Sequence, residues 1–303
     1  MAIAHIALQI LVILALPPLL MGLINKTKAL FGGRVGPPLF QLYYDLAKLF
    51  RKDSVTSRTT TWVFIAGPAV NLVAIVFAAL IIPIGPAPAP VHFSGDFVLF
   101  AYLLALGRFF TTSAALDTGS AFEGMGAARD VTYAAFAEVT LFFALLATGA
   151  LSHSTSLSTM LGGIDPATRV AATAPLVLSV AALAIVLLAE NARIPVDDPN
   201  THLELTMIHE VMVLDHSGPA LGVILYGASI KFLVFAAIIV RLALPPIDDV
   251  ALGWVLFLLL LLAVAIIVGV IESVMARLRL THVPALLVAS CLLAGFGFLL
   301  VVT

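Results

Sequence analysis

The sequence predicts an all-α protein that crosses a membrane about eight times, and its composition and hydropathy pattern support that prediction. Hydrophobic residues make up 62% of the 303 residues and charged residues only 11%, against about 45–50% and about 25% in soluble domains. A water-soluble protein of this size needs more charged residues to cover its surface. We therefore expect a single integral membrane domain over residues 1–303.

Eight apolar runs are long enough to cross the hydrocarbon core of a bilayer, which takes about 20 residues of helix. The run over 250–271 contains no charged residue, and the run over 171–189 lies between Arg169 and Glu190. The second span ends near Ile82, because the IGPAPAP sequence that follows interrupts a helix. The predicted spans are about 3–24, 61–83, 97–116, 131–151, 171–189, 219–241, 250–271 and 283–302.

The basic residues are distributed unevenly between the loops. Eleven of the 15 Lys and Arg residues fall on one predicted face of the bundle, and only Arg169 and Arg241 fall on the other. Cytoplasmic loops carry an excess of Lys and Arg, so we expect the first face in the cytoplasm and both termini outside it. The eleven are Lys26, Lys28, Arg34, Lys48, Arg51, Lys52, Arg58, Arg129, Arg193, Arg277 and Arg279.

Residues 39–52 form a different kind of segment between the first and second spans. Apolar residues recur there at helical spacing and polar residues take the opposite face, which predicts an amphipathic helix in the cytoplasmic interface. The glycines and prolines of 32–38 predict a turn before it. The helix serves either as a strut on the membrane surface or as a docking platform for a soluble partner. Its apolar positions are Leu39, Leu42, Tyr43, Leu46, Leu49 and Phe50, and its polar positions are Gln41, Asp45, Lys48 and Lys52.

Three ionisable residues lie within the predicted spans. Arg108 and Lys231 are near the middle of their runs, and Glu138 lies inside the fourth. An ionisable side chain in a span costs a few kcal/mol, so it faces the bundle interior or a hydrated cavity. Any one of them is explained by an ion pair that orients two helices. Three together favour a hydrated ion path.

The densest group of titratable residues follows the fifth span, over 190–216. The acidic turn DDPNT predicts the start of a short cytoplasmic helix, about 201–216. His202, His209 and His216 are spaced about 10 Å apart along such a helix, which disfavours a shared zinc ion and suits proton transfer or contact with a partner. The carboxylates expected to line the ion path here are Glu190, Asp197, Glu204, Glu210 and Asp215.

Three motifs resemble a known family, the eight-span membrane subunit that respiratory complex I (NADH-quinone oxidoreductase) shares with energy-converting membrane-bound nickel–iron hydrogenases. They are GRVGP with Gln41, Asp45 and Lys48 after it, GAAR ending at Arg129 with Glu138 beyond it, and ENARIPVDDPNTHLELTMIHE from Glu190. Asn200 and His202 replace two carboxylates of the complex I pattern, and Val196 replaces its phenylalanine. The sequence is therefore most similar to the formate hydrogenlyase subunit 4 branch.

The resemblance implies a non-catalytic subunit of an oxidoreductase complex that anchors a soluble redox arm and couples electron transfer to proton or sodium movement. It implies no cofactor in this chain, with the nickel–iron site and iron–sulfur clusters in partner subunits. The expected partners are hydrogenase-like large and small subunits, iron–sulfur subunits and antiporter-like membrane subunits, with no nucleic acid, in a prokaryotic inner membrane. The expected ion path comprises Arg108, Glu138, Glu190, Asp197, Glu204, Glu210, Asp215 and Lys231. The residues expected to dock the arm or line a quinone-like cavity are Arg34, Asp45, Lys48, Arg129, Arg193 and His202.

Three other functions fit the same sequence. A quinone-reducing complex of the complex I type predicts a cavity near Arg34 and the 190–204 segment. A stand-alone secondary transporter predicts transport by the chain alone, although we find no inverted repeat with matched broken helices. A purely structural anchor predicts that substitution of the buried acids affects assembly only.

Overall fold

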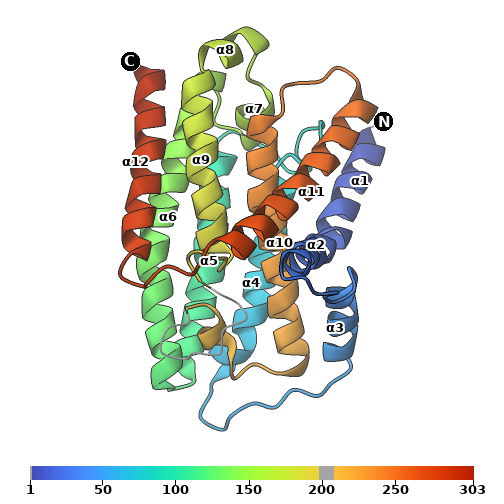
Figure 1. Cartoon of the computed structure of the whole chain (residues 1–303), viewed down its shortest axis with the longest axis vertical. Helices are drawn as coiled ribbons and strands as arrows, with labels where there is room; N and C mark the ends of the chain where they lie inside the picture. The colour runs from blue at the N-terminus through green and yellow to red at the C-terminus, as the bar shows by residue number, and fades with distance from the viewer. Residues whose placement is uncertain (1, 198–207) are drawn as a thin grey trace.

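The computed structural model describes residues 2–197 and 208–303, and all regular structure in this part of the chain is helical (Figure 1). Long helices form a bundle, and α7 and α8 lie together at one end of it. The helices are α1 (Ala2–Ala15), α2 (Pro17–Phe31), α3 (Gln41–Leu49), α4 (Trp62–Ile81), α5 (Asp96–Asp117), α6 (Ala121–Ser152), α7 (Leu157–Gly162), α8 (Pro166–Ala171), α9 (Thr173–Glu190), the 3₁₀ turn η1 (Glu210–Val213), α10 (Gly218–Ala243), α11 (Val250–Val274) and α12 (Val283–Val302).

The prediction of a membrane protein with about eight spans is confirmed. Within the described residues, seven helices are long and apolar enough to cross a membrane, and the pair α1 and α2 makes an eighth if it counts as one span. The predicted first span, 3–24, is wrong in detail because the chain bends by 46° between these two helices. The second of them continues to Phe31, so Lys26 and Lys28 lie on a helix rather than in a loop.

Tyrosine hydroxyls stabilise the break between α1 and α2. Residues 17–18 are prolines without an N–H, so carbonyl groups one turn earlier lose their helical partners. The Tyr226 hydroxyl donates to the Leu14 carbonyl oxygen at 2.8 Å, and the Tyr43 hydroxyl donates to that of Ala15. The Tyr226 hydroxyl of α10 therefore replaces the donor that Pro18 lacks, and the Tyr43 hydroxyl of α3 adds a hydrogen bond to the next carbonyl along the chain.

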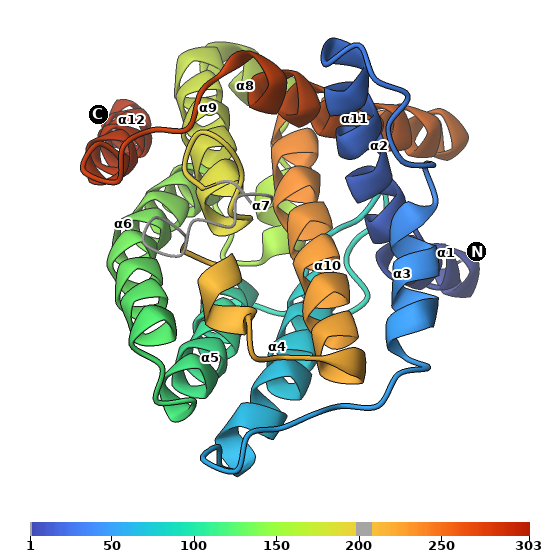
Figure 2. The ribbon, with the colours of Figure 1, turned by 60° about the horizontal axis from the view of Figure 1, so that its bottom comes forward.

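Helix α10 is the centre of the bundle (Figure 2). It packs against α1, α2, α3, α4, α7, α9 and α11. Every residue from Phe232 to Ile238 is almost completely buried, whereas the outer helices expose apolar side chains on their outward faces. Lys231 lies halfway along this helix, and its ammonium group contacts Glu190 of α9 inside the bundle.

Two of the predicted helices differ from those observed near the end of the bundle that carries α3. Helix α6 begins ten residues earlier than the predicted span 131–151, because its polar first turns find partners on other elements instead of facing lipid. The amphipathic helix predicted over 39–52 is confirmed but covers only 41–49. On it Leu46 is buried and Lys48 is exposed, as the pattern indicates.

The predicted helix over 201–216 is not continuous. In its described part only residues 210–213 are helical, as a 3₁₀ turn. The Asp197 carboxylate accepts the backbone N–H groups of Ile208 and His209, both at 3.1 Å, which holds the backbone outside a helix there. The predicted site residues His202 and Glu204 lie outside the described residues. The histidine spacing derived from a straight helix is therefore wrong beyond residue 209.

Both termini lie at the same end of the bundle, with α7 and α8 (Figure 1). Arg169 lies at this end, where its guanidinium donates to the carbonyl oxygen of Leu242. Helix α3 and the segment joining it to α4 lie toward the opposite end. This arrangement agrees with an even number of crossings, and the side that faces the cytoplasm stays a prediction from the basic residues.

We expect Tyr226→Phe to lower the free energy of unfolding by about 0.5–1.5 kcal/mol, because the Leu14 carbonyl loses its donor at the proline break. Denaturation of the purified chain in mild detergent measures the change. Tyr44→Phe is the matched control, since Tyr44 lies on α3 with 62% of its surface exposed. Equal stability of the two variants would contradict this role of the hydroxyl.

Candidate functional site

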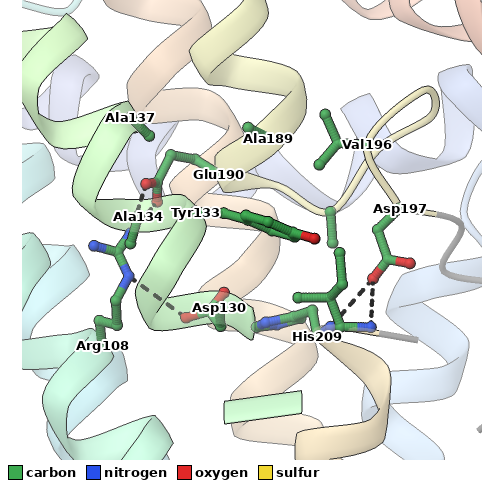
Figure 3. A pocket seen from close by; sticks show the side chains of 12 residues that line it. Arg108, Asp130, Tyr133, Ala134, Ala137, Ala189, Glu190, Val196, Asp197 and His209 are labelled. Atoms are coloured by element: carbon green, nitrogen blue, oxygen red, sulfur yellow. Dashed lines mark hydrogen bonds and ion pairs between the residues drawn. The ribbon is translucent and has the colours of Figure 1, made fainter. Parts of the chain in front are cut away.

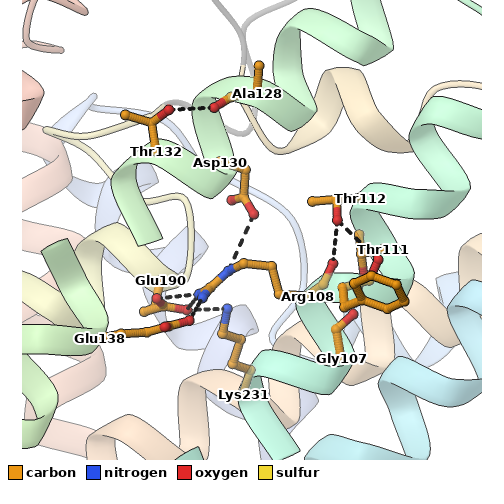
Figure 4. A network of polar contacts seen from close by, with 11 residues as sticks. Gly107, Arg108, Thr111, Thr112, Ala128, Asp130, Thr132, Glu138, Glu190 and Lys231 are labelled. Atoms are coloured by element: carbon orange, nitrogen blue, oxygen red, sulfur yellow. Dashed lines mark hydrogen bonds and ion pairs between the residues drawn. The ribbon is translucent and has the colours of Figure 1, made fainter. Parts of the chain in front are cut away.

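An arginine on α5 is the centre of a charged cluster inside the bundle. The Arg108 Nη2 atom lies 2.5 Å from Glu190 Oε1 on α9, and Nε lies 3.5 Å from Asp130 on α6. The third contact joins Arg108 Nη1 to Glu138, which lies eight residues after Asp130 on α6. Figure 4 shows the three carboxylates converging on the one guanidinium group.

A lysine on α10 completes this cluster. The Lys231 Nζ atom lies 2.6 Å from Glu190 Oε2, so the Glu190 carboxylate is held between two cations. Only 5% of the Glu190 side chain is exposed, against 41% for Glu138. Burial of an ion costs several kcal/mol unless it is paired, so the two cations stabilise Glu190 in the charged form. We call Arg108, Asp130, Glu138, Glu190 and Lys231 the central cluster.

Small polar cavities adjoin the central cluster. One of about 20 Å³ lies between Arg108, Asp130, Glu190, Asp197 and His209 (Figure 3). A second, of about 70 Å³, includes Lys231 and again reaches His209. About 10–15 Å³ is enough for one water molecule. The central cluster is thus connected, through spaces that fit water beside several polar groups, to the segment after α9.

A second set of ion pairs holds that segment against α2 and α11. Glu272 of α11 is almost completely buried and lies 2.7 Å from Lys28 Nζ and 3.3 Å from Arg193 Nη1. Asp197 lies 2.8 Å from Arg277. Residues 191–197 are therefore fixed by charges from elements that are distant in the sequence.

A larger cavity opens beside the same segment. It has a volume of about 500 Å³ and lies between α2, α3, residues 191–197, residues 209–216 and α10. Its lining residues include four that were predicted for the ion path or for docking, Asp45, Arg193, Asp197 and Glu210. The quinone hypothesis predicts a cavity here, and one is present, although Arg34 does not line it.

Other predicted site residues lie away from the central cluster. Arg34 is in the exposed turn between α2 and α3, and Lys48 is exposed on α3. Arg129 is on α6, with Nη2 2.9 Å from the sulfur of Met125. Asp215 is exposed. Arg34 and Lys48 are on the surface that a docking role requires, whereas Asp215 is not in contact with the central cluster.

The sequence interpretation missed Asp130 and Glu272. Asp130 follows Arg129 and precedes the predicted fourth span, where a charged residue is expected in a loop. Glu272 follows directly after the predicted seventh span, 250–271, where a charged residue is expected to face solvent. Both are on helices that continue beyond the apolar run, α6 and α11. Their roles depend on basic partners that only the folded chain brings close.

Two histidines near the cavity are held neutral by burial. Burial lowers the pKa of His209, and it lowers the pKa of His216 to about 4. The His216 ring stacks on Phe64 with centroids 4.0 Å apart. Within residues 2–197 and 208–303, no group of three or more His, Cys, Asp or Glu side chains is arranged to hold a metal ion.

The fold and the site define a class: a multi-spanning membrane protein with a cluster of paired charges in its interior. Its family follows from sequence comparison. The model of the NADH dehydrogenase family matches residues 3–303, and the chain belongs to that family.

Two relatives from Escherichia coli (strain K12) align over most of the chain. Formate hydrogenlyase subunit 4 is 31% identical, with 98% of this chain and 96% of the relative covered. Hydrogenase-4 component C is 29% identical, with 89% and 87% covered. A solved structure of the membrane-bound sulfane sulfur reductase, described as an archaeal respiratory membrane complex, contains a chain that matches with a TM-score of 0.80. The match covers 99% of both chains at 21% identity and shows a shared fold.

We expect the folded protein to lose stability as the pH is lowered, and His216 to contribute to that loss. Its pKa is about 4 in the folded state and about 6.5 in an unfolded chain. The unfolded state therefore binds an extra proton as pH falls from about 6.5 toward 4, which favours unfolding. His216→Phe removes this contribution, so the variant should gain on the order of 2 kcal/mol relative to wild type between pH 7 and pH 4.

Denaturation in mild detergent at several pH values measures this difference. His282→Gln is the control, because His282 is exposed. The difference in free energy of unfolding between wild type and His216→Phe should change with pH. If it stays constant over this pH range, the ring is not held neutral.

Proposed function

We propose that this chain is the membrane subunit of a multi-subunit redox complex of the hydrogenase type, in which it anchors the soluble arm and couples electron transfer to ion movement. Its two Escherichia coli relatives are named as components of formate hydrogenlyase and hydrogenase-4. The observation that carries the proposal is the central cluster, with three carboxylates and two cations inside an apolar bundle.

The central cluster has more carboxylates than cations, so one carboxylate can take a proton without leaving a cation unpaired. Glu138 suits that role, because it has the most exposed side chain of the five and Arg108 keeps two other carboxylates when Glu138 is neutral. Glu190 suits a different role. Held between Arg108 and Lys231, it stays charged and keeps both cations in place.

A lateral cavity connects Glu138 with the membrane-facing side of the bundle. It has a volume of about 330 Å³, and Tyr102, Arg108 and Glu190 also line it. A carboxylate on such a surface needs a polar partner. We assign this side to a neighbouring membrane subunit, which receives the ion and is antiporter-like in the family resemblance.

The opposite end of the path is the segment that follows α9. The 20 Å³ cavity connects the central cluster with His209 and Asp197, and the 70 Å³ cavity connects it with His209. The 500 Å³ cavity adjoins both residues. A change of charge in a docked redox arm would act first on this segment. The exposed basic residues Arg34 and Lys48, beside α3, supply a surface for the arm.

The redox chemistry belongs to partner subunits in this proposal. The sequence has one cysteine, Cys291 on α12, and a single thiolate does not hold an iron–sulfur cluster, which takes four protein ligands. We place the nickel–iron site and the clusters in hydrogenase-like large and small subunits and iron–sulfur subunits. With the basic end of the bundle in the cytoplasm, the arm docks there and both termini lie outside.

We expect Glu138→Gln to reduce ion translocation at least about tenfold while the redox activity of the soluble arm continues, because the amide cannot accept a proton. Membrane vesicles containing the whole complex allow both to be measured on one sample. Asp248→Asn, in an exposed loop, is the control. Translocation at the wild-type rate in Glu138→Gln would remove this residue from the path.

Purification of the chain with its partners tests the identity of the complex. We expect a gentle-detergent pull-down to recover a hydrogenase-like large subunit together with nickel and iron. Iron without nickel, beside a flavin-containing arm, would favour the quinone-reducing alternative, for which the 500 Å³ cavity is the supporting observation. Recovery of a stable chain alone would contradict both and favour a transporter.

A further inference from the structure

Two arginines lie together at the end of the bundle that carries the termini. Arg241 is in the last turn of α10, and Arg169 is on α8. The Arg169 guanidinium donates to the carbonyl oxygen of Leu242, which places it next to Arg241. The electrostatic interaction between the two arginines is repulsive. Two like charges are thus held side by side, away from the central cluster.

Arg241 is buried without a carboxylate partner among the residues that the structure describes. Only 8% of its surface is exposed, and its Nε atom is buried without a hydrogen-bond partner. Across the described residues, Arg241 and Arg169 form no ion pair with a carboxylate. The acids that precede Arg169 and follow Arg241 in the sequence have other roles: Asp165 caps α8 through the Thr168 N–H, and Asp249 caps α11.

Helix α7 forms one wall around the Arg241 guanidinium. Gly162, its last residue, has no side chain, and a Cβ atom there would lie 2.2 Å from Arg241 Nη2. The glycine therefore leaves the space that the guanidinium occupies. Arg241 is enclosed by the fold rather than free to extend into water.

Two neighbouring guanidinium groups are a suitable partner for one phosphate group. A buried charge without a counter-charge is costly, and a second like charge nearby adds to that cost. An anion between the two arginines removes both penalties. The guanidinium fork matches phosphate oxygens in pairs, through hydrogen bonds that are stronger than those between neutral groups.

We propose that Arg169 and Arg241 form a phosphate-binding site for the headgroup of an anionic phospholipid in the leaflet next to the termini. The site lies at the ends of membrane-spanning helices, where lipid phosphates lie. Exposed apolar side chains follow Arg169 along α8 and the start of α9, with 77% of Val170 and 61% of Val177 exposed. These valines provide a surface for acyl chains, which favours a lipid over an acidic protein segment.

The test is native mass spectrometry of this subunit released from the complex purified in mild detergent. We expect wild type to carry a bound anionic phospholipid. The double variant Arg169→Gln/Arg241→Gln should carry it with at least about tenfold lower occupancy, which corresponds to about 1.4 kcal/mol. Arg169→Gln alone, at the less buried position, gives the same direction of change if the double variant does not assemble. Arg169→Lys should retain part of the occupancy.

Arg58→Gln is the matched control, because Arg58 is an exposed arginine in the loop between α3 and α4. Addition of inorganic phosphate to delipidated complex separates the two sources. A phosphate adduct that depends on both arginines, without any lipid adduct, would keep the anion site and overturn the lipid as its occupant. Equal lipid occupancy in wild type and the arginine variants would overturn the proposal. So would loss of a protein subunit from these variants without loss of lipid.

Discussion

The pairing of Glu190 with Arg108 and Lys231 is the interaction on which the interior of this bundle depends. Glu190 is the last residue of α9, where the helix dipole disfavours a negative charge, and its side chain is almost fully buried. Two cations from α5 and α10 offset both effects. Removal of Glu190 would leave Lys231 without its carboxylate partner among apolar helices, at a cost of about 3–5 kcal/mol. The three helices are therefore oriented by one carboxylate.

The segment after Glu190 connects this interior to the large cavity. Arg193 and Asp197 are held by Glu272 and Arg277, from α11 and the segment that follows it. The Asp197 carboxylate also accepts backbone N–H groups of residues 208–209. A movement of the segment thus changes the surroundings of the cavity and of the small polar spaces beside the central cluster at the same time. This coupling is what the proposed function requires of the chain.

The apolar runs predicted most of the fold because membrane insertion imposes a minimum length of apolar helix. They failed where helices continue with charged residues. The first turns of α6 contain Arg129 and Asp130, and the last turn of α11 contains Glu272. A hydropathy reading ends a span at such residues. The helix continues because Asp130 and Glu272 find basic partners on neighbouring elements.

The sequence by itself determined the class of protein, the number of spans, the amphipathic α3 and the ionisable residues that enter the membrane. Those properties follow from local composition and from the cost of exposing charge to lipid. Only the tertiary structure decided which charges meet. Arg108 pairs with the carboxylates of residues 130, 138 and 190. Arg169 lies next to Arg241 rather than next to an acid. These pairings join residues far apart in the chain, and their geometry is set by how the helices pack around α10.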